Sequence, residues 1–510
     1  MTGLDHTILT WILLVPAVGA VILSLLPDRG KLIQFWTLLV ALVTFGLTLH
    51  LPAHFDYART GPQFEINRLW ILSPPIHYHV GVDGLSMWLV VLTGFLAPIG
   101  VLCSWNAINT RVKEFYALFL LQQTAMLGVF LALDLMVYYA FWELSLVPMA
   151  ITIAMFGRDP SGRNSSRAAI KFFLYTFIPS ALFLVGILAL YARTGTFDFF
   201  TLQATLAQHP TLFSVDALQW ISLAFLVAFA VKVPVFPLHG WLGDAFAEAP
   251  TAMAMILAGK LGLYSIIRFH LGLFPAQARQ VAPWMIALAV IGILYGALVA
   301  LVQYDLKRLL AFATVSSLSF CTLGIYTFTI NGLDGAVFHI LSESIAAAAM
   351  LVLMGIIYER YGTYDITRYG GLAAKTPRLA SLFVITVLAL IGLPILNGFV
   401  GEFLTLSSGF ATSNLWGALG TGGVILSAAY MLWMVQRIFY GPESPLVHRE
   451  PVRDLVAREH LTLWPMAVLM LIMGVASPYW IRAIDHGVHA LANTPAPAHP
   501  AATAPTGGAE

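Results

Sequence analysis

Five ionisable side chains stand inside runs of apolar residues. Glu143 is enclosed by "LMVYYAFW" and "LSLVPMAITIAMF", and the other four are Lys232, Lys260, Glu343 and Glu402. A charge at the centre of a membrane helix costs about 2.5–3.5 kcal/mol on insertion scales, so such groups are rarely kept without a role. Carboxylates and amines hold and release protons, and the pattern therefore indicates proton or ion transfer. The alternative for each is a structural hydrogen bond or ion pair, or, for a lysine near a span end, an ammonium group that reaches the interface.

The composition of the chain places these groups in a membrane. Of 510 residues, 59% are hydrophobic and 10% are charged, and the mean hydropathy is +0.83. Globular proteins carry about 25% charged residues. A net charge of +1 supplies no basic surface for nucleic acid. Cys103 and Cys321 lie in different apolar segments, so they predict no disulfide framework and no cluster site.

The apolar stretches are about 20 residues long, which is the length that crosses a hydrocarbon core as a helix. They predict an all-α polytopic membrane protein with fourteen transmembrane helices. The predicted spans are 6–26, 31–51, 81–103, 115–131, 135–156, 168–192, 217–239, 250–271, 283–303, 309–329, 333–357, 379–400, 414–438 and 463–482. The first is interpreted as a retained helix rather than a cleaved signal peptide, because no basic segment precedes it.

Lysine and arginine are distributed unevenly between the two sides of the predicted bundle. Loops after odd-numbered spans hold eighteen of the 26 basic residues, and the opposite side holds six, among them Arg268. The positive-inside rule puts the basic side in the cytoplasm. Both termini are therefore expected on the outer, periplasmic side of a bacterial inner membrane. The remaining two basic residues, Lys232 and Lys260, fall within spans.

Two of the predicted spans contain helix-breaking residues beside a charge. "VKVPVFPLHGWLGDAFAEAP" has two prolines directly after Lys232, and "LIGLPILNGFVGEFLTL" has glycine and proline just before Glu402. Proline removes a backbone donor and clashes with the preceding turn, so both helices are expected to be interrupted. Interrupted helices at corresponding places in two halves favour an ion path near the midplane. The alternative is an ordinary proline kink.

The rest of the chain is predicted as loop. These segments are 52–80, 193–216 and a C-terminal tail at 483–510, which is expected to be partly disordered because its Ala, Pro, Thr and Gly residues cannot bury a core. Four histidines gather on the outer side: His50, His54, His77 and His79. No cysteine or carboxylate pattern accompanies them, so no metal site is predicted.

Five motifs follow one another along the chain. They are "GVDGLSMWLVVLTG" (81–94), "DLMVYYAFWELSLVPM" (134–149), "FAVKVPVFPLHGWLGDA" (229–245), "YDLKRLLAFATVS" (304–316) and "NGFVGEF" (397–403). In this order they resemble the antiporter-like membrane subunits of the proton-pumping NADH:quinone oxidoreductase, respiratory complex I. The resemblance covers most of residues 81–440 and is strongest to subunit M, the homologue of mitochondrial subunit 4.

The resemblance implies a particular domain organisation. Two inverted five-helix repeats, with discontinuous seventh and twelfth helices, follow three N-terminal helices. The implied divisions are 1–114, 115–271 for the first repeat, 283–440 for the second, 441–482 for a loop and the last helix, and 483–510 for the tail.

The resemblance also implies roles and partners. Glu143, Lys232, Lys260 and Glu402 match positions of the family's proton pathway, with Glu143 as the movable partner of Lys232. The chain shows no nicotinamide, flavin or iron–sulfur motif, so NADH, FMN, the iron–sulfur clusters and quinone are expected in partner subunits. The expected partners are the L, N, K, J, A and H homologues and the lipid bilayer, without nucleic acid.

This sequence departs from the family at several positions. About three residues are missing between Lys232 and Lys260, and Ser317 and Glu343 stand where the family has histidines. His339 lies four residues before Glu343, so on a helix the two could bond directly and replace those histidines as a proton relay. The alternative is that Glu343 only hydrogen-bonds a neighbouring helix.

Three functional classes are compatible with these sequence features. The first is a proton-translocating subunit of complex I, active as part of an enzyme whose redox chemistry lies in other chains. The second is a subunit of a Mrp-type cation/proton antiporter or of a membrane hydrogenase arm. The third is a structural relative that does not pump.

Overall fold

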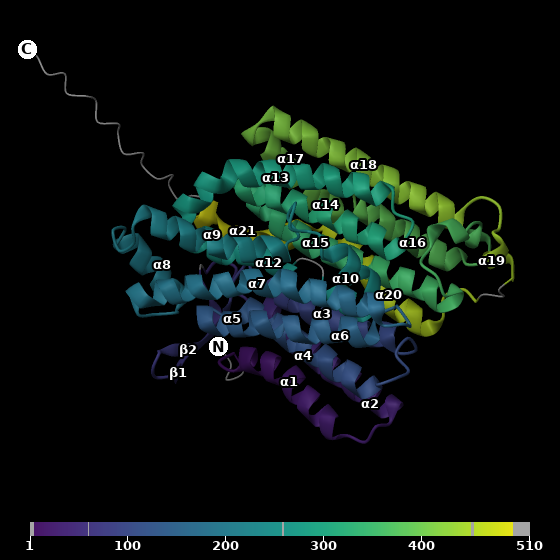
Figure 1. The fold of residues 1–510 in the computed structure, drawn as a ribbon, viewed down its shortest axis with the longest axis horizontal. Helices are drawn as coiled ribbons and strands as arrows, with labels where there is room; N and C mark the ends of the chain where they lie inside the picture. The colour runs from purple at the N-terminus through teal and green to yellow at the C-terminus, as the bar shows by residue number, and fades with distance from the viewer. Residues whose placement is uncertain (1–4, 60, 258–259, 450–452, 493–510) are drawn as a thin grey trace, which may run out of the picture.

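A computed structural model describes residues 5–59, 61–257, 260–449 and 453–492 as a bundle of long helices (Figure 1). Within these residues, twelve helices are long and apolar enough to cross a membrane, and thirteen if a bent pair near the C-terminus counts as one span. The predicted all-α polytopic class is therefore confirmed. The count of fourteen is not reached by this measure, because the twelfth predicted span consists of two short helices.

The N-terminal part combines three helices with a hairpin. Its elements are α1 (Ile8–Leu25), α2 (Gly30–His54), β1 (Gln63–Ile71), β2 (Ile76–Val82) and α3 (Met87–Ser104). The two strands are antiparallel, with Ile66 opposite Val80. The hairpin occupies most of the segment 52–80, so the prediction of a plain loop there was wrong. The alternation of apolar residues with histidines in "IHYHV" is a strand pattern that this prediction overlooked.

The next part of the chain holds the first interrupted helix. Its elements are α4 (Val112–Leu131), α5 (Leu135–Leu144), α6 (Leu146–Phe156), α7 (Arg163–Thr194), α8 (Phe199–Gln208), α9 (Val215–Lys232), α10 (Leu242–Glu248), α11 (Thr251–Leu257), α12 (Lys260–Ser265) and the π-helix η1 (Ile266–Leu271). Helix α8 lies in the predicted loop 193–216. The predicted interruption is confirmed, because α9 ends at Lys232 and the next helix begins at Leu242.

A side chain satisfies part of the backbone that this interruption frees. Pro234 has no N–H to continue the helical bonds of α9. The carbonyl oxygen of Ala230, which Pro234 cannot bond, accepts a hydrogen bond from the N–H of Val235 at 2.9 Å. The carbonyl oxygen of Val231, left without Val235, accepts one from the indole Nε1 of Trp241 at 2.9 Å. Helix α9 can therefore stop inside the bundle, where an unpaired carbonyl would otherwise be costly.

The following part contains the second interrupted helix. Its elements are α13 (Pro275–Leu301), α14 (Leu306–Tyr326), α15 (Ile330–Tyr361), the short 3₁₀ turns η2 (Ile366–Arg368) and η3 (Leu372–Ala374), α16 (Pro377–Leu390), α17 (Asn397–Thr412) and α18 (Asn414–Phe439). The interruption between α16 and α17 is confirmed. At Gly392 the backbone has a φ of +70°, a conformation that favours glycine. The predicted bounds 379–400 were wrong, because the second half-helix extends to Thr412.

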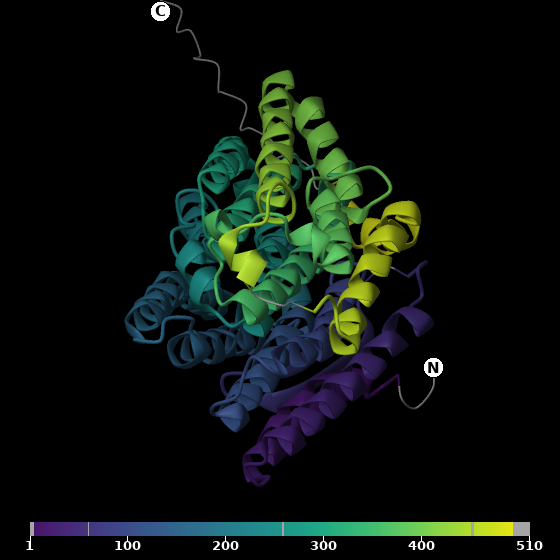
Figure 2. The ribbon, with the colours of Figure 1, turned by 90° about the vertical axis from the view of Figure 1, so that its right-hand side faces the viewer.

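The C-terminal part turns back across the bundle. It consists of α19 (Pro445–Arg449), α20 (Ala457–Val475) and α21 (Pro478–Ala492), and α20 and α21 meet at an angle of 72° (Figure 2). The segment predicted as a tail therefore begins inside α21. Its remainder, 493–510, lies outside the described residues.

Helix α15 is the central element of the molecule, and most of its 32 residues are buried (Figure 1). It packs against α11, α14, α17, α20 and α21. Near one end Arg360 forms an ion pair with Glu459 of α20 at 2.7 Å, and near the other Asp334 hydrogen-bonds Asp485 of α21. Helix α10 packs on α14 and α11 on α15, so the two interrupted regions belong to one continuous core.

Candidate functional site

Glu143 lies in the last turn of α5 and is half-buried. Helix α5 is well defined at its start, because the carboxylate of Asp134 accepts hydrogen bonds from the N–H groups of Met136 and Val137 at 2.9 and 3.2 Å. At the other end, the hydroxyl of Ser180 from α7 donates a hydrogen bond to the carboxylate of Glu143. A packed helix and a second helix therefore hold this carboxylate in place.

Lys232 is the last residue of α9 and is 9% exposed. Its Nζ donates to the hydroxyl of Ser145 at 3.0 Å and lies 4.7 Å from the ring centroid of Trp142. A cation over an aromatic ring gains about 2 kcal/mol when it is shielded from water. The negative end of the α9 dipole also favours a positive charge at this position.

Glu143 and Lys232 interact through space. Among the described residues, no ion pair within 4.0 Å joins them, and Trp142 and Ser145, on either side of Glu143 in sequence, make the direct contacts with the lysine. The carboxylate is thus close enough to act on the ammonium group without being bonded to it.

Lys260 shares a small cavity with Lys232. The cavity has a volume of about 20 Å³, and Gln122, Ser145 and Trp241 also line it. Lys260 is 4% exposed, and its Nζ donates to the carbonyl of Met255 at 3.4 Å. The three residues missing upstream of Lys260 therefore do not separate the two lysines.

His339 and Glu343 both lie on α15, and their hydrogen-bond partners differ from those expected. His339 is 1% exposed and Glu343 is 5% exposed. The direct bond expected between them is not among the hydrogen bonds of the described residues, so this expectation was wrong. The Nε2 of His339 instead lies 2.8 Å from the hydroxyl of Ser317, and the hydroxyl of Thr314 donates to Glu343 at 3.4 Å.

Ser317 connects the two members of this group. Its hydroxyl lies 2.8 Å from the Nε2 of His339, and its side chain also acts on the carboxyl group of Glu343. One turn of helix separates the two α15 side chains along the axis, and the hydroxyl from α14 lies beside both. The structure therefore joins them through a second helix, α14, rather than along their own.

Glu402 lies on α17 and packs into the break between α16 and α17. A Cβ placed on Gly392 would lie 2.2 Å from the Oε2 of Glu402, so the carboxyl group rests directly on the glycine. Gly401, its neighbour, packs in the same close way on the backbone and Cβ of His339. Glu402 also interacts electrostatically with Glu343. The second half thus gathers one imidazole and two carboxyl groups.

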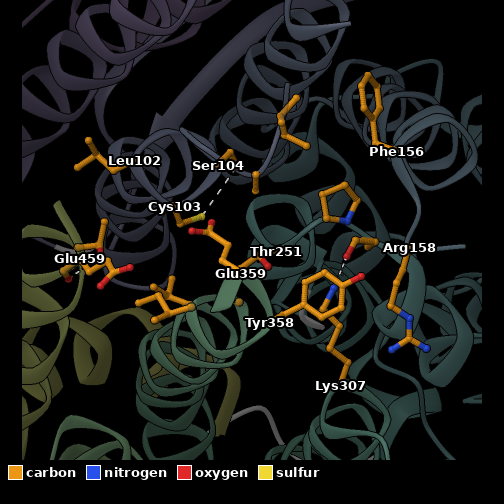
Figure 3. Close-up of a pocket in the computed structure, with 18 of the residues that line it drawn as sticks. Leu102, Cys103, Ser104, Phe156, Arg158, Thr251, Lys307, Tyr358, Glu359 and Glu459 are labelled. Carbon is orange, nitrogen blue, oxygen red and sulfur yellow. Dashed lines mark hydrogen bonds between the residues drawn. The ribbon is translucent and has the colours of Figure 1, made fainter. Parts of the chain in front are cut away.

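A wider cavity opens where loops of the predicted basic side meet. Its volume is about 140 Å³, and Figure 3 shows Arg158 and Lys307 towards one end and Glu459 at the other, with Glu359 between them. Arg158 pairs with Asp305 at 2.5 Å, and Lys307, which is 2% exposed, donates to the carbonyl of Ala249 at 2.6 Å.

Helix α11 separates the wider cavity from the one between the lysines. Thr251 lines the wider cavity and Ile256 lines the smaller one. The carbonyl of Met255, which accepts from Lys260, belongs to the same helix, and the sulfur of Met255 lies 4.0 Å from that of Cys103 on the wall of the wider cavity. One short helix thus lies between polar space at the basic side and the buried lysines.

Several buried polar residues were not predicted from the sequence. Arg268 was counted in an outer loop, but it is 7% exposed inside the π-helix and makes two 2.6 Å bonds to the carboxylate of Asp83. Lys307 was also assigned to a loop. Gln122 was not considered, although it stands in the apolar run "FLLQQTAML". A search for all polar side chains in apolar runs, rather than for charges alone, would have found it.

Two of the four outer histidines, His50 and His79, contact carboxylates. His79 hydrogen-bonds Asp198 through Nδ1 and Glu65 through Nε2, the latter at 2.9 Å, and His50 pairs with Asp5 at 2.8 Å. Burial lowers the pKa of His79, but the hydrogen bonds and charges of Asp198 and Glu65 outweigh this and raise it. Within the described residues, no three potential ligands are grouped to hold a metal ion.

Comparison with known sequences places this geometry in a family. Residues 132–427 match the family described as "NADH:quinone oxidoreductase/Mrp antiporter, TM". NADH-quinone oxidoreductase subunit M of Rhodobacter capsulatus is 39% identical over 489 residues, covering 92% of this chain and 93% of that protein. NADH-ubiquinone oxidoreductase chain 4 of Arabidopsis thaliana is 36% identical over 472 residues, with 92% and 93% covered.

Comparison with solved structures agrees with this. A chain of "Respiratory complex I from Thermus thermophilus with bound NADH" superposes with a TM-score of 0.86 at 31% identity, covering 95% of this chain and 99% of that one. A chain of the Mrp complex from Dietzia sp. DQ12-45-1b has a TM-score of 0.85 at 19% identity, covering 96% and 98%, and so shares the fold. The chain belongs to the NADH:quinone oxidoreductase/Mrp antiporter family of membrane subunits and, within it, to the relatives of subunit M.

Proposed function

We propose that this chain is the membrane-arm subunit through which an NADH:quinone oxidoreductase translocates protons. NADH, FMN, the iron–sulfur clusters and quinone belong to partner subunits, whose homologues are L, N, K, J, A and H. The observation that carries the proposal is the pair of buried lysines on one small cavity, with a carboxylate acting on one of them. Two ammonium groups in so small an apolar space repel each other, so a proton held by one favours the neutral form of the other.

The first half of the pathway consists of Glu143, Lys232 and Lys260. The carboxylate of Glu143 stabilises a proton on Lys232 by its charge, although the two groups are not bonded. A small displacement of α5 or α9 changes that distance and with it the stability of the ammonium form. Redox steps in partner subunits drive such displacements, and the proton then passes from Lys232 to Lys260.

The second half consists of His339, Glu343 and Glu402. Helix α12, which begins at Lys260, packs on α15, which carries the first two of these residues. Ser317 links the imidazole to the Glu343 carboxyl group, and Glu402 completes the group at the break between α16 and α17. The pathway thus contains two sets of proton-holding side chains, one from residues 115–271 and one from residues 283–440.

The protein is proposed to lie in a bacterial inner membrane with both termini on the periplasmic side. The eighteen-to-six bias of basic residues supports this orientation. With Cys103 and Cys321 replaced, a single cysteine at exposed Ser161 is expected to react from the cytoplasmic side. One at exposed Arg68 should react from the other. The reverse labelling pattern would overturn this orientation.

The proposal is tested with variants of the first half in the assembled complex. Glu143→Gln and Lys232→Ala should each suppress proton translocation by reconstituted vesicles, and Glu143→Asp should do so less. Lys31→Ala removes an exposed lysine from α2 and is the matched control, which should pump normally. Normal proton translocation by both Glu143→Gln and Lys232→Ala would exclude the proposed pathway.

Two other functions share this fold. One is a subunit of a Mrp-type cation/proton antiporter or a membrane hydrogenase arm, and the other is a structural relative without a pumping role. Purification of the native complex separates them from the proposal. Recovery with flavin and iron–sulfur subunits supports an NADH:quinone oxidoreductase, whereas recovery with antiporter subunits alone would reject it.

A further inference from the structure

Gln122, a residue that lines the cavity between Lys232 and Lys260, has a side-chain oxygen that no described protein group uses. The side-chain oxygen Oε1 of Gln122, on α4, has no hydrogen-bond partner among the residues that the structure describes. Gln122 is 2% exposed and lines this cavity, whose other walls are mostly apolar. A buried amide oxygen without a partner costs about 1–3 kcal/mol, so a partner is expected.

The size of the cavity fits one water molecule. Its volume is about 20 Å³. A water molecule needs roughly 10–15 Å³ of such space, together with two to four polar partners. Lys232, Lys260, Gln122 and Ser145 all line the cavity and supply those partners. The space is therefore large enough for one water and too small for a chain of them.

The amines of both lysines have bonding capacity left over. An ammonium group has three N–H donors. The Nζ of Lys232 uses one on Ser145, and that of Lys260 uses one on the carbonyl of Met255. Each can therefore donate to a water in the cavity when protonated, and each can accept from it when neutral.

We propose that Gln122 holds a single water molecule between Lys232 and Lys260 and orients it for proton transfer. This inference rests on the proposed function. One hydrogen of the water is bonded to Oε1 of Gln122, so the other points at the neutral amine of Lys260. The protonated Lys232 donates to the water oxygen.

The transfer then conserves atoms and charge. An N–H bond of Lys232 breaks as an O–H bond forms, and the O–H bond facing Lys260 breaks as a new N–H bond forms. The water is regenerated, and the positive charge has moved from one lysine to the other. The amide of Gln122 gains and loses no proton, so Gln122 is a positioning residue rather than a carrier.

The chain offers a matched control for this role. Gln123 is the next residue of α4, is fully buried and likewise has side-chain atoms without partners among the described residues. It does not line the cavity. Replacing either glutamine by methionine keeps its length and removes the amide, so the two variants differ in whether the cavity loses its acceptor.

The experiment uses the assembled complex in vesicles and measures the rate of proton translocation in H₂O and in D₂O. Gln122→Met should slow translocation about tenfold, the factor expected from losing a hydrogen bond to a charged network. It should also raise the H₂O/D₂O rate ratio, because transfer through the misplaced water becomes rate-limiting. Gln123→Met should change neither, and Gln122→Glu, which keeps an acceptor oxygen, should be less impaired than Gln122→Met.

A second measurement examines the site directly. A high-resolution cryo-electron microscopy map of the complex should show a density peak within hydrogen-bonding distance of Gln122, Lys232 and Lys260. The peak should be absent or displaced in Gln122→Met. The inference would be overturned if the map of the unchanged protein showed protein atoms filling the cavity and no such peak.

The outcomes also distinguish this inference from the proposed function. Normal pumping by Gln122→Met, with pumping lost in Lys232→Ala, would overturn the role of Gln122 and leave the lysine pathway intact. Equal loss in Gln122→Met and Gln123→Met would assign the effect to packing of α4 and reject the inference. Normal pumping by both Lys232→Ala and Glu143→Gln would instead reject the proposed function itself.

Discussion

The two interrupted helices place different ionisable groups at their breaks. In the first half, α9 stops at Lys232, so a cation lies at the negative end of a helix dipole. In the second half, α17 starts at Asn397 and Glu402 lies in its second turn, near the positive end. The N-cap of α17, Leu396, provides no side-chain cap for the first N–H groups of this helix.

The two halves also hold protons on different groups. The amine of Lys232 lies at the C-terminal end of α9, whereas the carboxyl group of Glu402 rests on Gly392, between the C-terminal end of α16 and the N-terminal end of α17. Trp142 and Ser145 contact the amine of Lys232, and a hydroxyl group of α14 contacts the carboxyl group of Glu343. Similar breaks can therefore serve opposite charges.

The largest expected effect concerns whether the second half works as one unit. Glu343→Gln and His339→Phe should each lower proton translocation at least about tenfold, since general acid–base groups typically contribute a factor of 10² or more. The double variant should be little worse than either single variant, because residues that act together are not additive. Proton uptake by reconstituted vesicles measures all three.

The control for this prediction is Glu343→His, which restores the residue of the family and should retain substantial activity. Full pumping by Glu343→Gln would show that this acid is structural. The two halves could then no longer be compared as proton-holding sites, because Glu343 would hold no proton in the second half.

A smaller effect is expected at the hydroxyl that joins the second group. Ser317→Ala should slow translocation about fivefold, as expected from losing a neutral hydrogen bond worth about 1 kcal/mol. Ser316→Ala is the matched control, because Ser316 is the preceding residue of α14 and donates to the carbonyl of Ile293 at 2.7 Å instead. Equal effects of the two variants would remove Ser317 from the relay.

Much of this arrangement could be predicted from the sequence because its signals are local. Prolines after Lys232 and glycine and proline before Glu402 break helices wherever those helices pack. The meeting of Gln122 with two lysines could not be predicted, because it depends on how α4, α9 and α12 pack. The burial of Arg268 was missed for a related reason, since only its pairing with Asp83 makes a charge tolerable inside a span.

The smallest expected effect lies outside the membrane, at the hairpin of the N-terminal part. The pKa of His79 is raised by Asp198 and Glu65 against the effect of burial. A raised pKa means that the charged pairs stabilise the folded hairpin fully below the ordinary histidine value of 6.5. This stabilisation is lost as the pH rises through the folded value.

Hydrogen exchange of residues 63–82, corrected for the intrinsic rate, should therefore become faster as the pH rises above the ordinary histidine value of 6.5. His79→Gln should abolish this dependence, and His77→Gln on the same strand should keep it. An unchanged pH profile in His79→Gln would show that other groups control the hairpin.

The anchoring of α15 at both ends limits how the second half can move. One end is tied to α20 through Arg360 and Glu459, and the other to α21 through Asp334 and Asp485. Since α20 and α21 are continuous in sequence, together they hold both ends of α15. Sliding of α15 along its axis would stretch one tie and compress the other. We therefore expect motion of a neighbouring subunit to rotate α15 about its axis. Such a rotation would move His339 and Glu343 sideways past α14 without changing their depth in the membrane.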